Sequence, residues 1–213
     1  MFDCGESLNN HITHPLISKK SISIYQKCSK LFYYLIHQGI QVPDDNYADP
    51  DTGNLGQEAL RLFRSRFPDG IYVEEKTPHS ESVQKTLELI KKRNTVFNAV
   101  LKADNIAAHI DVLLPVGQDK WDIYTVKCSM GVKNSHLFDS AFIYHIAQKN
   151  RIKIRSCKSV SINPEYIREK ELDVYRLFRI SDVSSEAGRL FGWVNRTLKD
   201  MNKVLCQKNP PKT

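Results

Sequence analysis

The spacing of apolar residues along the chain predicts helices toward both ends and strands in the middle. In four segments apolar side chains recur at steps of three and four residues, which places them on one face of a helix. A fifth segment is apolar on most of its faces, as is typical of a helix pressed against a sheet. The four amphipathic segments are 21–37, 55–67, 80–93 and 187–205, and the fifth is 135–148.

Four further segments have the composition and spacing of strands. The first alternates partly between apolar and polar residues, the next two are largely apolar, and the last alternates strictly at its start. These segments are 95–103, 106–114, 121–128 and 151–162. Because a helix lies between the third and the fourth, we expect an antiparallel meander followed by a crossover connection, which joins parallel strands. The expected fold class is α/β (α+β), with a mixed central sheet flanked by helices.

The pattern also predicts one folded domain between two irregular ends. Residues 1–20 are polar and predict a flexible N-terminal segment. Residues 206–213 close with Asn-Pro-Pro-Lys-Thr and predict a disordered tail. The stretch between them, 21–205, is long enough to bury a core as a single domain.

Composition narrows the class of protein. A hydrophobic content of 41% and a charged content of 26% are typical of a soluble globular protein. The apolar runs are too short to cross a bilayer, and the acidic, polar N-terminus is unlike a secretory signal, so we expect a cytoplasmic protein and no membrane partner. The five cysteines are scattered without a Cys-x-x-Cys pair, which indicates neither a disulfide framework nor a closed zinc site.

The charge balance favours an anionic partner. A net charge of +7 raises the rate of encounter with DNA or RNA through attraction to phosphate. The cations are spread along the chain, but Arg151, Lys153 and Arg155 alternate on one predicted strand face. These three are candidate nucleic-acid contacts, and the alternative is an ordinary solvated strand face.

Two charged residues stand near the ends of apolar strands, Asp111 and Lys127. An unpaired buried carboxylate is costly, so a charge in such a strand needs a partner. One interpretation is a metal site, because Mg²⁺ prefers carboxylate oxygens, and a nearby lysine can orient the attacking water. The other is an ion pair between Asp111 and Lys127, or a contact of Asp111 with His109, which needs no metal. Thr125, on the same strand face as Lys127, is a poor Mg²⁺ ligand.

Longer motifs carry a more specific likeness. They comprise Gly56-Gln-Glu-Ala-Leu-Arg-Leu-Phe with Phe67-Pro-Asp-Gly, Thr95-Val-Phe-Asn-Ala-Val-Leu with His109-Ile-Asp-Val-Leu, Trp121-Asp-Ile-Tyr-Thr-Val-Lys-Cys-Ser with Val132 to Tyr144, and the segments from Ile162 to Tyr166 and from Leu177 to Val183. With these segments the chain resembles a poorly characterised bacterial family of RecB-like nucleases in the PD-(D/E)XK superfamily. That family joins a nuclease domain related to RecB and to the CRISPR adaptation exonucleases to a further C-terminal domain.

The resemblance spans roughly 21–205 and implies a restriction-endonuclease-like core. It implies a hydrolase that cleaves DNA or RNA with Mg²⁺ or Mn²⁺. Lys127 and Asp111 would stand in the catalytic places, and Asp111 and Glu58 would be metal ligands. Relatives often hold an iron–sulfur cluster on one N-terminal and three C-terminal cysteines. Cys28 has the N-terminal place, but the chain ends where the others should stand, so we expect no cluster.

Three positions depart from the family pattern. Thr125 replaces the glutamate before the lysine, Ile143 replaces a glutamine on the following helix, and Asn98 replaces a glutamate or glutamine on the preceding strand. These departures predict a shortened pseudoenzyme with lost or severely reduced catalysis that binds nucleic acid.

Two alternatives stay open. One is a working nuclease with a rearranged site that draws its ligands from Glu58, Asp111 and either Asp122 or Asp139. The other is a non-catalytic fragment or interaction domain whose partner is a missing C-terminal domain or another protein.

Overall fold

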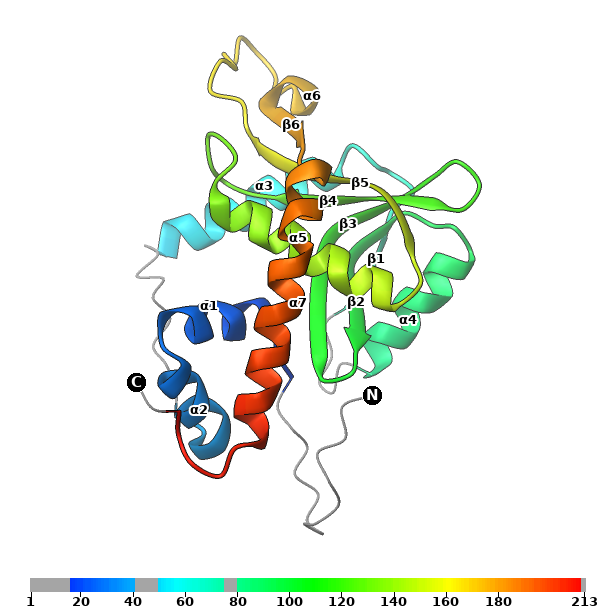
Figure 1. Cartoon of the computed structure of the whole chain (residues 1–213). Helices are drawn as coiled ribbons and strands as arrows, with labels where there is room; N and C mark the ends of the chain where they lie inside the picture. The colour runs from blue at the N-terminus through cyan, green and yellow to red at the C-terminus, as the bar shows by residue number, and fades with distance from the viewer. Residues whose placement is uncertain (1–15, 41–49, 75–79, 212–213) are drawn as a thin grey trace.

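A computed structural model describes residues 16–40, 50–74 and 80–211 of the chain (Figure 1). Helices and strands follow one another in the order α1 (Lys19–Lys27), α2 (Ser29–Gln38), α3 (Pro50–Arg64), β1 (Ile71–Tyr72), α4 (Ser80–Lys91), β2 (Val96–Ala103), β3 (Ile106–Val116), β4 (Lys120–Val126), α5 (Asn134–Lys149), β5 (Lys153–Ile162), α6 (Val174–Leu177), β6 (Phe178–Asp182) and α7 (Ser184–Cys206).

The strands form one mixed sheet in the order β1-β2-β3-β4-β5-β6. Strands β2, β3 and β4 pair as an antiparallel meander, and β4 pairs with β5 in parallel after the crossover through α5. The predicted α/β class with a mixed sheet flanked by helices is therefore confirmed. The sequence reading missed both edge strands, β1, which pairs in parallel with β2, and β6, which pairs antiparallel with β5.

Helices cover both faces of this sheet (Figure 1). On one face α5 and α7 bury the larger apolar cluster, which contains Ile123 of β4 and Ile146 of α5. On the other face α3 buries a smaller cluster around Phe63, Val112 and Tyr124. Because successive strand residues point to opposite faces, the neighbours Ile123 and Tyr124 reach different clusters.

The ends of the folded region differ from the prediction. The expected helix over 21–37 is two helices, because Cys28 is extended at φ −162° and its thiol accepts the Leu31 N–H as the N-cap of α2. Ile17 is fully buried and bridges to Ile106, so 16–20 are not a flexible segment. Within the predicted tail, the Lys208 carbonyl accepts a hydrogen bond from Tyr33. Residues 1–15 and 212–213 lie outside the described residues.

The pairing of β2 with β3 is irregular at Asn98 and Asp111. Asn98 has a positive φ of 53°, and the register that pairs Phe97 with Val112 and Ala99 with Ile110 sets Asn98 opposite Asp111. Pairing of β3 with β4 starts only one residue later, at Val112 and Tyr124. Strands β3 and β4 are therefore no longer paired at Asp111. Of the helices that the structure describes, none has the length and apolar character needed to cross a membrane.

Candidate functional site

Asp111 closes the end of the β3–β4 ladder. Its Oδ2 accepts the backbone N–H of Val126 at 2.7 Å, in place of a strand carbonyl. Burial raises the pKa of the Asp111 carboxyl, and the charge of Lys127 and the Val126 hydrogen bond oppose that rise without cancelling it. The hydrogen bond with Val126 therefore gives Asp111 a structural role that needs no metal.

Lys127 pairs with a carboxylate on the crossover helix. Thr125 and Lys127 follow Ile123 in the alternation of β4, so they face α5. The Lys127 ammonium lies 3.0 Å from Oδ2 of Asp139, which is almost completely buried. Burial lowers the pKa of Lys127, but the charges of Asp139 and Asp111 outweigh that effect and leave the pKa raised. Lys127 is therefore firmly protonated at neutral pH.

A second ammonium, from Lys19, binds the same Oδ2 atom of Asp139. The architecture brings it there across 120 residues of sequence, because the bridge from Ile17 to Ile106 and the Ser18 cap fix the start of α1. Burial lowers the pKa of Lys19, the Asp139 charge opposes this, and the neighbouring Lys127 charge adds to it. One carboxylate oxygen thus has two cationic partners.

Arg64, the last residue of α3, completes the group from the other face of the sheet. Its guanidinium lies 5.0 Å from the ring centre of Tyr72 and 5.6 Å from that of Phe97. Burial lowers the pKa of Arg64, and Tyr72 and the Asp111 charge oppose this. We call Arg64, Asp111, Lys127, Asp139 and Lys19 the charge chain. Positive and negative groups alternate along it, and the cations outnumber the carboxylates.

The charge chain does not fit a divalent metal ion. The Asp139 oxygen is engaged by two ammonium groups, and Asp111 is bonded to the backbone and flanked by Lys127 and Arg64. The Thr125 hydroxyl is directed at the Lys158 carbonyl, 3.5 Å away. Across 16–40, 50–74 and 80–211, no three His, Cys, Asp or Glu side chains are grouped so that they could hold a metal. A site with excess positive charge repels a divalent cation.

Glu58 lies away from this group, on the solvent face of α3. Its two carboxylate oxygens accept hydrogen bonds from Arg61 at 2.8 and 2.6 Å. The largest charge effects on the pKa of Asp111 come from Lys127, Arg64 and Lys19. The structure thus brings Asp111 and Lys127 together with Asp139 and leaves Glu58 outside.

Asp122, the alternative ligand, belongs to a separate ion-pair group on the α3 face. Its carboxylate is fully buried and accepts hydrogen bonds from Arg155 and, at 2.9 Å, from Lys158. Burial raises the pKa of Asp122, but these hydrogen bonds outweigh the effect and hold it below its usual value. We call Asp122, Arg155 and Lys158 the Asp122 triad.

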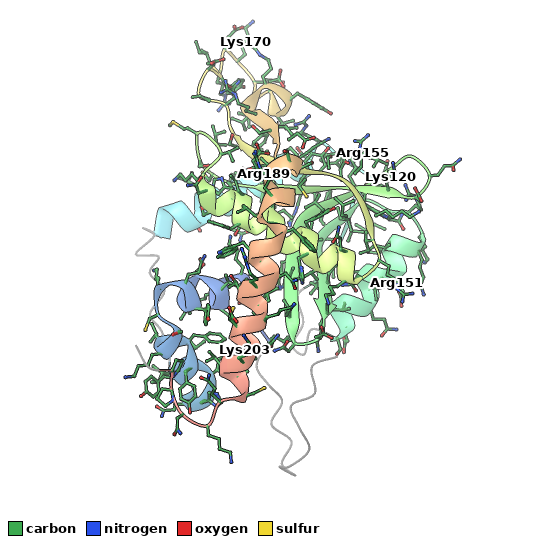
Figure 2. All side chains as sticks on the ribbon, in the orientation of Figure 1. Lys120, Arg151, Arg155, Lys170, Arg189 and Lys203 are labelled. Carbon is green, nitrogen blue, oxygen red and sulfur yellow. The ribbon has the colours of Figure 1, made fainter. Side chains whose placement is uncertain are left out.

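The predicted strand-face cations are mostly engaged with carboxylates. Arg155 belongs to the Asp122 triad, and Lys153 pairs with Asp119. Arg151 lies before β5 in a left-handed conformation with φ 57°. Figure 2 shows the labelled lysines and arginines spread over several parts of the molecule, with Arg151 well separated from Arg155. Two of the three cations are therefore paired with carboxylates of the protein itself.

Two other residues named in the sequence analysis, Asn98 and Cys28, have structural roles. The Asn98 amide donates to the Val73 carbonyl at 2.9 Å, which ties β2 to the residue after β1. The Cys28 thiol caps α2, as described above. Sequence reasoning missed Lys19 and Arg64, because neither stands in an apolar strand where a charge attracts notice.

No family model matches this chain, and a search of curated proteins likewise gives no match.

Proposed function

We propose that this chain is a nuclease-descended domain that binds the phosphates of DNA or RNA without a divalent metal and without efficient cleavage. The observation that carries the proposal is the sharing of Asp139 Oδ2 by the ammonium groups of Lys19 and Lys127. Metal-assisted hydrolysis needs carboxylate oxygens that are free to bind the ion. Here Asp139 Oδ2 is bound by two ammonium groups, and Asp111 Oδ2 accepts the backbone N–H of Val126.

The same charges favour a phosphate. The charge chain contains three cations and two carboxylates, so an incoming phosphate meets net positive charge where a metal ion meets repulsion. Lysine and arginine contacts to phosphate release counterions, which makes binding steeply dependent on salt. We further propose a cytoplasmic location, from a hydrophobic and charged content typical of soluble globular proteins.

A calorimetric titration with Mn²⁺ tests the absence of a metal site. We expect no saturable heat for the natural chain. Thr125→Glu together with Ile143→Gln supplies the two family ligands, and adding Lys19→Met removes the competing ammonium. We expect Mn²⁺ binding in the triple variant that is at least about tenfold tighter than in the Thr125→Glu, Ile143→Gln variant, which corresponds to about 1.4 kcal/mol.

Lys20→Met is the matched control, because it removes a neighbouring lysine of the same helix. It should leave Mn²⁺ binding unchanged in either background. Circular dichroism of each variant checks that the fold is retained. Stoichiometric Mn²⁺ binding by the natural chain, with cleavage that Asp111→Ala abolishes, would contradict the proposal and support the rearranged nuclease.

A further inference from the structure

We infer that a surface at the end of α3 binds single-stranded nucleic acid by stacking unpaired bases on Tyr72 and Tyr175. This inference rests on the proposed function and specifies the form of its ligand. The α3-end surface consists of Arg64, Arg66, Tyr72 and Tyr175, and it meets the charge chain at Arg64.

Two arginines at the end of α3 each hold an exposed tyrosine ring. The Arg64 guanidinium lies 5.0 Å from the ring centre of Tyr72, and that of Arg66 lies 4.8 Å from Tyr175. Tyr72 and Tyr175 are 52% and 64% exposed, so a large part of each residue is open to solvent. The surface thus contains two similar pairs, each an arginine beside a tyrosine that is partly open to solvent.

The inner sides of both arginines rest on buried rings. Arg64 lies 5.6 Å from the ring centre of Phe97, and Arg66 lies 5.3 Å from that of Phe63. Packing against these rings limits the positions open to the guanidinium groups, so the tyrosines they touch are held in place as well. A rigid platform loses less entropy on binding than a mobile one.

Some donors of both guanidinium groups are unused. Arg64 Nε and Arg66 Nε and Nη1 are buried and have no hydrogen-bond partner within the described part of the chain. A buried donor without an acceptor is unfavourable, and a phosphate oxygen is a strong acceptor for arginine. These atoms are covered by their neighbours and cannot be reached from solvent, so it is the positive charge of the two guanidinium groups that favours an anionic ligand.

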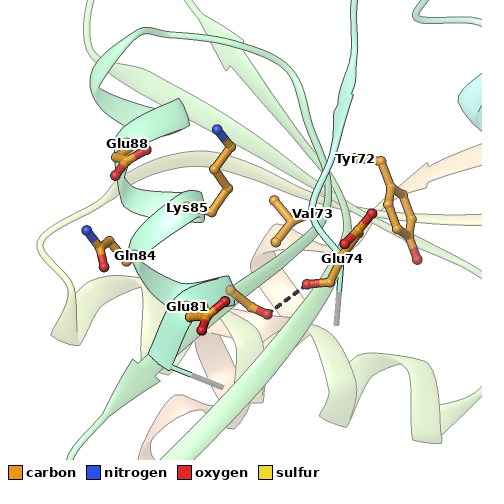
Figure 3. Close-up of a pocket in the computed structure, with 8 residues that line it drawn as sticks. Tyr72, Val73, Glu74, Glu81, Gln84, Lys85 and Glu88 are labelled. Carbon is orange, nitrogen blue, oxygen red and sulfur yellow. Dashed lines mark hydrogen bonds between the residues drawn. The ribbon is translucent and has the colours of Figure 1, made fainter. Parts of the chain in front are cut away.

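The direction of Tyr72 favours the α3 side of β1. Figure 3 shows the Tyr72 ring on the opposite side of the strand from α4. Tyr72 also contributes to the lining of the pocket between β1 and α4, where its charged neighbours are Glu74, Glu81 and Glu88 against the single cation Lys85. The carboxylates of that pocket repel phosphate. By contrast, the Arg64 guanidinium lies over the Tyr72 ring, and its charge also acts on the Asp111 carboxylate.

Exposed rings beside cations suit single strands better than duplexes. Unpaired bases present their faces for stacking, while in a duplex these faces are covered by neighbouring base pairs. Stacking on tyrosine and phosphate contacts with arginine both tolerate any base sequence. The inferred ligand is therefore a single strand of DNA or RNA without a defined sequence.

Fluorescence anisotropy with labelled single-stranded and duplex oligonucleotides of one length, in chelator, tests the inference. We expect tighter binding of the single strand. Tyr72→Ala and Tyr175→Ala should each weaken it about 5- to 100-fold. Tyr72→Phe and Tyr175→Phe keep the aromatic face and should retain most of the affinity. Ile40→Ala, which removes a side chain of similar exposure beyond α2, is the control and should have no effect.

The outcomes separate this inference from the proposed function. Salt-dependent binding that is equal for single strand and duplex, or that both tyrosine-to-alanine variants leave unchanged, would overturn the inference and leave the proposed function standing. Absence of salt-dependent binding to either form would remove both. A loss of affinity in the phenylalanine variants as large as in the alanine variants would also overturn it, because stacking would then not explain the effect.

Discussion

The Asp122 triad and the charge chain are built from the same kinds of residue, yet their carboxylates respond in opposite ways. The pKa of Asp122 is held below its usual value, whereas that of Asp111 is raised. Hydrogen bonds from Arg155 and Lys158 satisfy Asp122, while Asp111 accepts a backbone N–H and meets its cations only at longer range. Hydrogen bonds to the charged form lower the pKa of a carboxyl group, whereas burial raises it, and burial prevails at Asp111.

The two groups also differ in how the chain assembles them. The Asp122 triad comes from the neighbouring strands β4 and β5, so strand pairing alone forms it. The charge chain draws on α1, α3, β3, β4 and α5, which pack around the point where β3 and β4 separate. We infer that the triad stabilises the sheet, whereas under the proposed function the cations of the charge chain contribute to phosphate binding.

The largest expected difference concerns stability. Asp122→Asn weakens the hydrogen bonds from Arg155 and Lys158 to a buried carboxylate, and losing hydrogen bonds to a charged group costs about 1.5–3 kcal/mol of unfolding free energy. Asp139→Asn should cost less, because both lysines contact a single oxygen, which the asparagine amide retains, whereas Arg155 and Lys158 use both oxygens of Asp122. Urea denaturation measures both. Equal losses of unfolding free energy in the two variants would contradict this difference between the Asp122 triad and the charge chain.

Gly70→Ala tests the packing that supports the α3-end surface. A Cβ at this position would come within 2.1 Å of the Phe97 ring, which also underlies Arg64. The ring has to move, and overpacking of this kind costs about 1–3 kcal/mol. We expect lower thermal stability together with weaker nucleic-acid binding. Unchanged stability would show that the Phe97 ring adapts freely.

The pH dependence of stability should have opposite signs at the two aspartates. The lowered pKa of Asp122 contributes stability that is present above its unfolded value of 3.8 and is lost as the pH falls through the folded pKa. The raised pKa of Asp111 does the reverse, so stability falls as the pH rises from 3.8 through the folded pKa.

Asp111→Asn keeps an acceptor for the Val126 N–H and should remove the second dependence alone. Asp122→Asn should remove the first alone. Denaturation at a series of pH values measures both effects. A loss of stability at high pH that persists in Asp111→Asn would contradict the assignment to this carboxyl.

The smallest expected effects concern single phosphate contacts. Lys127→Gln should weaken nucleic-acid binding and reduce the slope of log K against log salt by about 1. Asp139→Asn should act in the opposite direction and tighten binding, because it removes a negative charge from the charge chain. Anisotropy titrations at several salt concentrations measure both. A weakening by Asp139→Asn would mean that this carboxylate positions the lysines that bind phosphate.

The sequence predicted the central sheet because its strands are long and buried. Strands β2 to β5 have clear apolar spacing, and the helix between β4 and β5 requires a crossover. It did not predict β1, which has two exposed residues, or β6, in which only Phe178 is buried. It did not predict the break at Cys28 either, because neither glycine nor proline marks it.

The candidate site was predictable only in part, for a similar reason. Asp111 and Lys127 are charges within apolar strands, so their own neighbours identify them. Lys19 and Arg64 lie on helices, where charges are common, and only packing brings them to Asp139 and Asp111. The sequence makes Asp139 an alternative metal ligand, but the spacing of residues along the chain does not predict its two lysine partners.

The most direct test of the metal-independent account is the affinity for a labelled oligonucleotide, measured over a series of salt concentrations with chelator and again with Mg²⁺ kept low against the monovalent salt. Binding by the natural chain should fall linearly in log K against log salt, with the same values in both series. Binding that appears only with Mg²⁺, or that does not change with salt, would contradict the account.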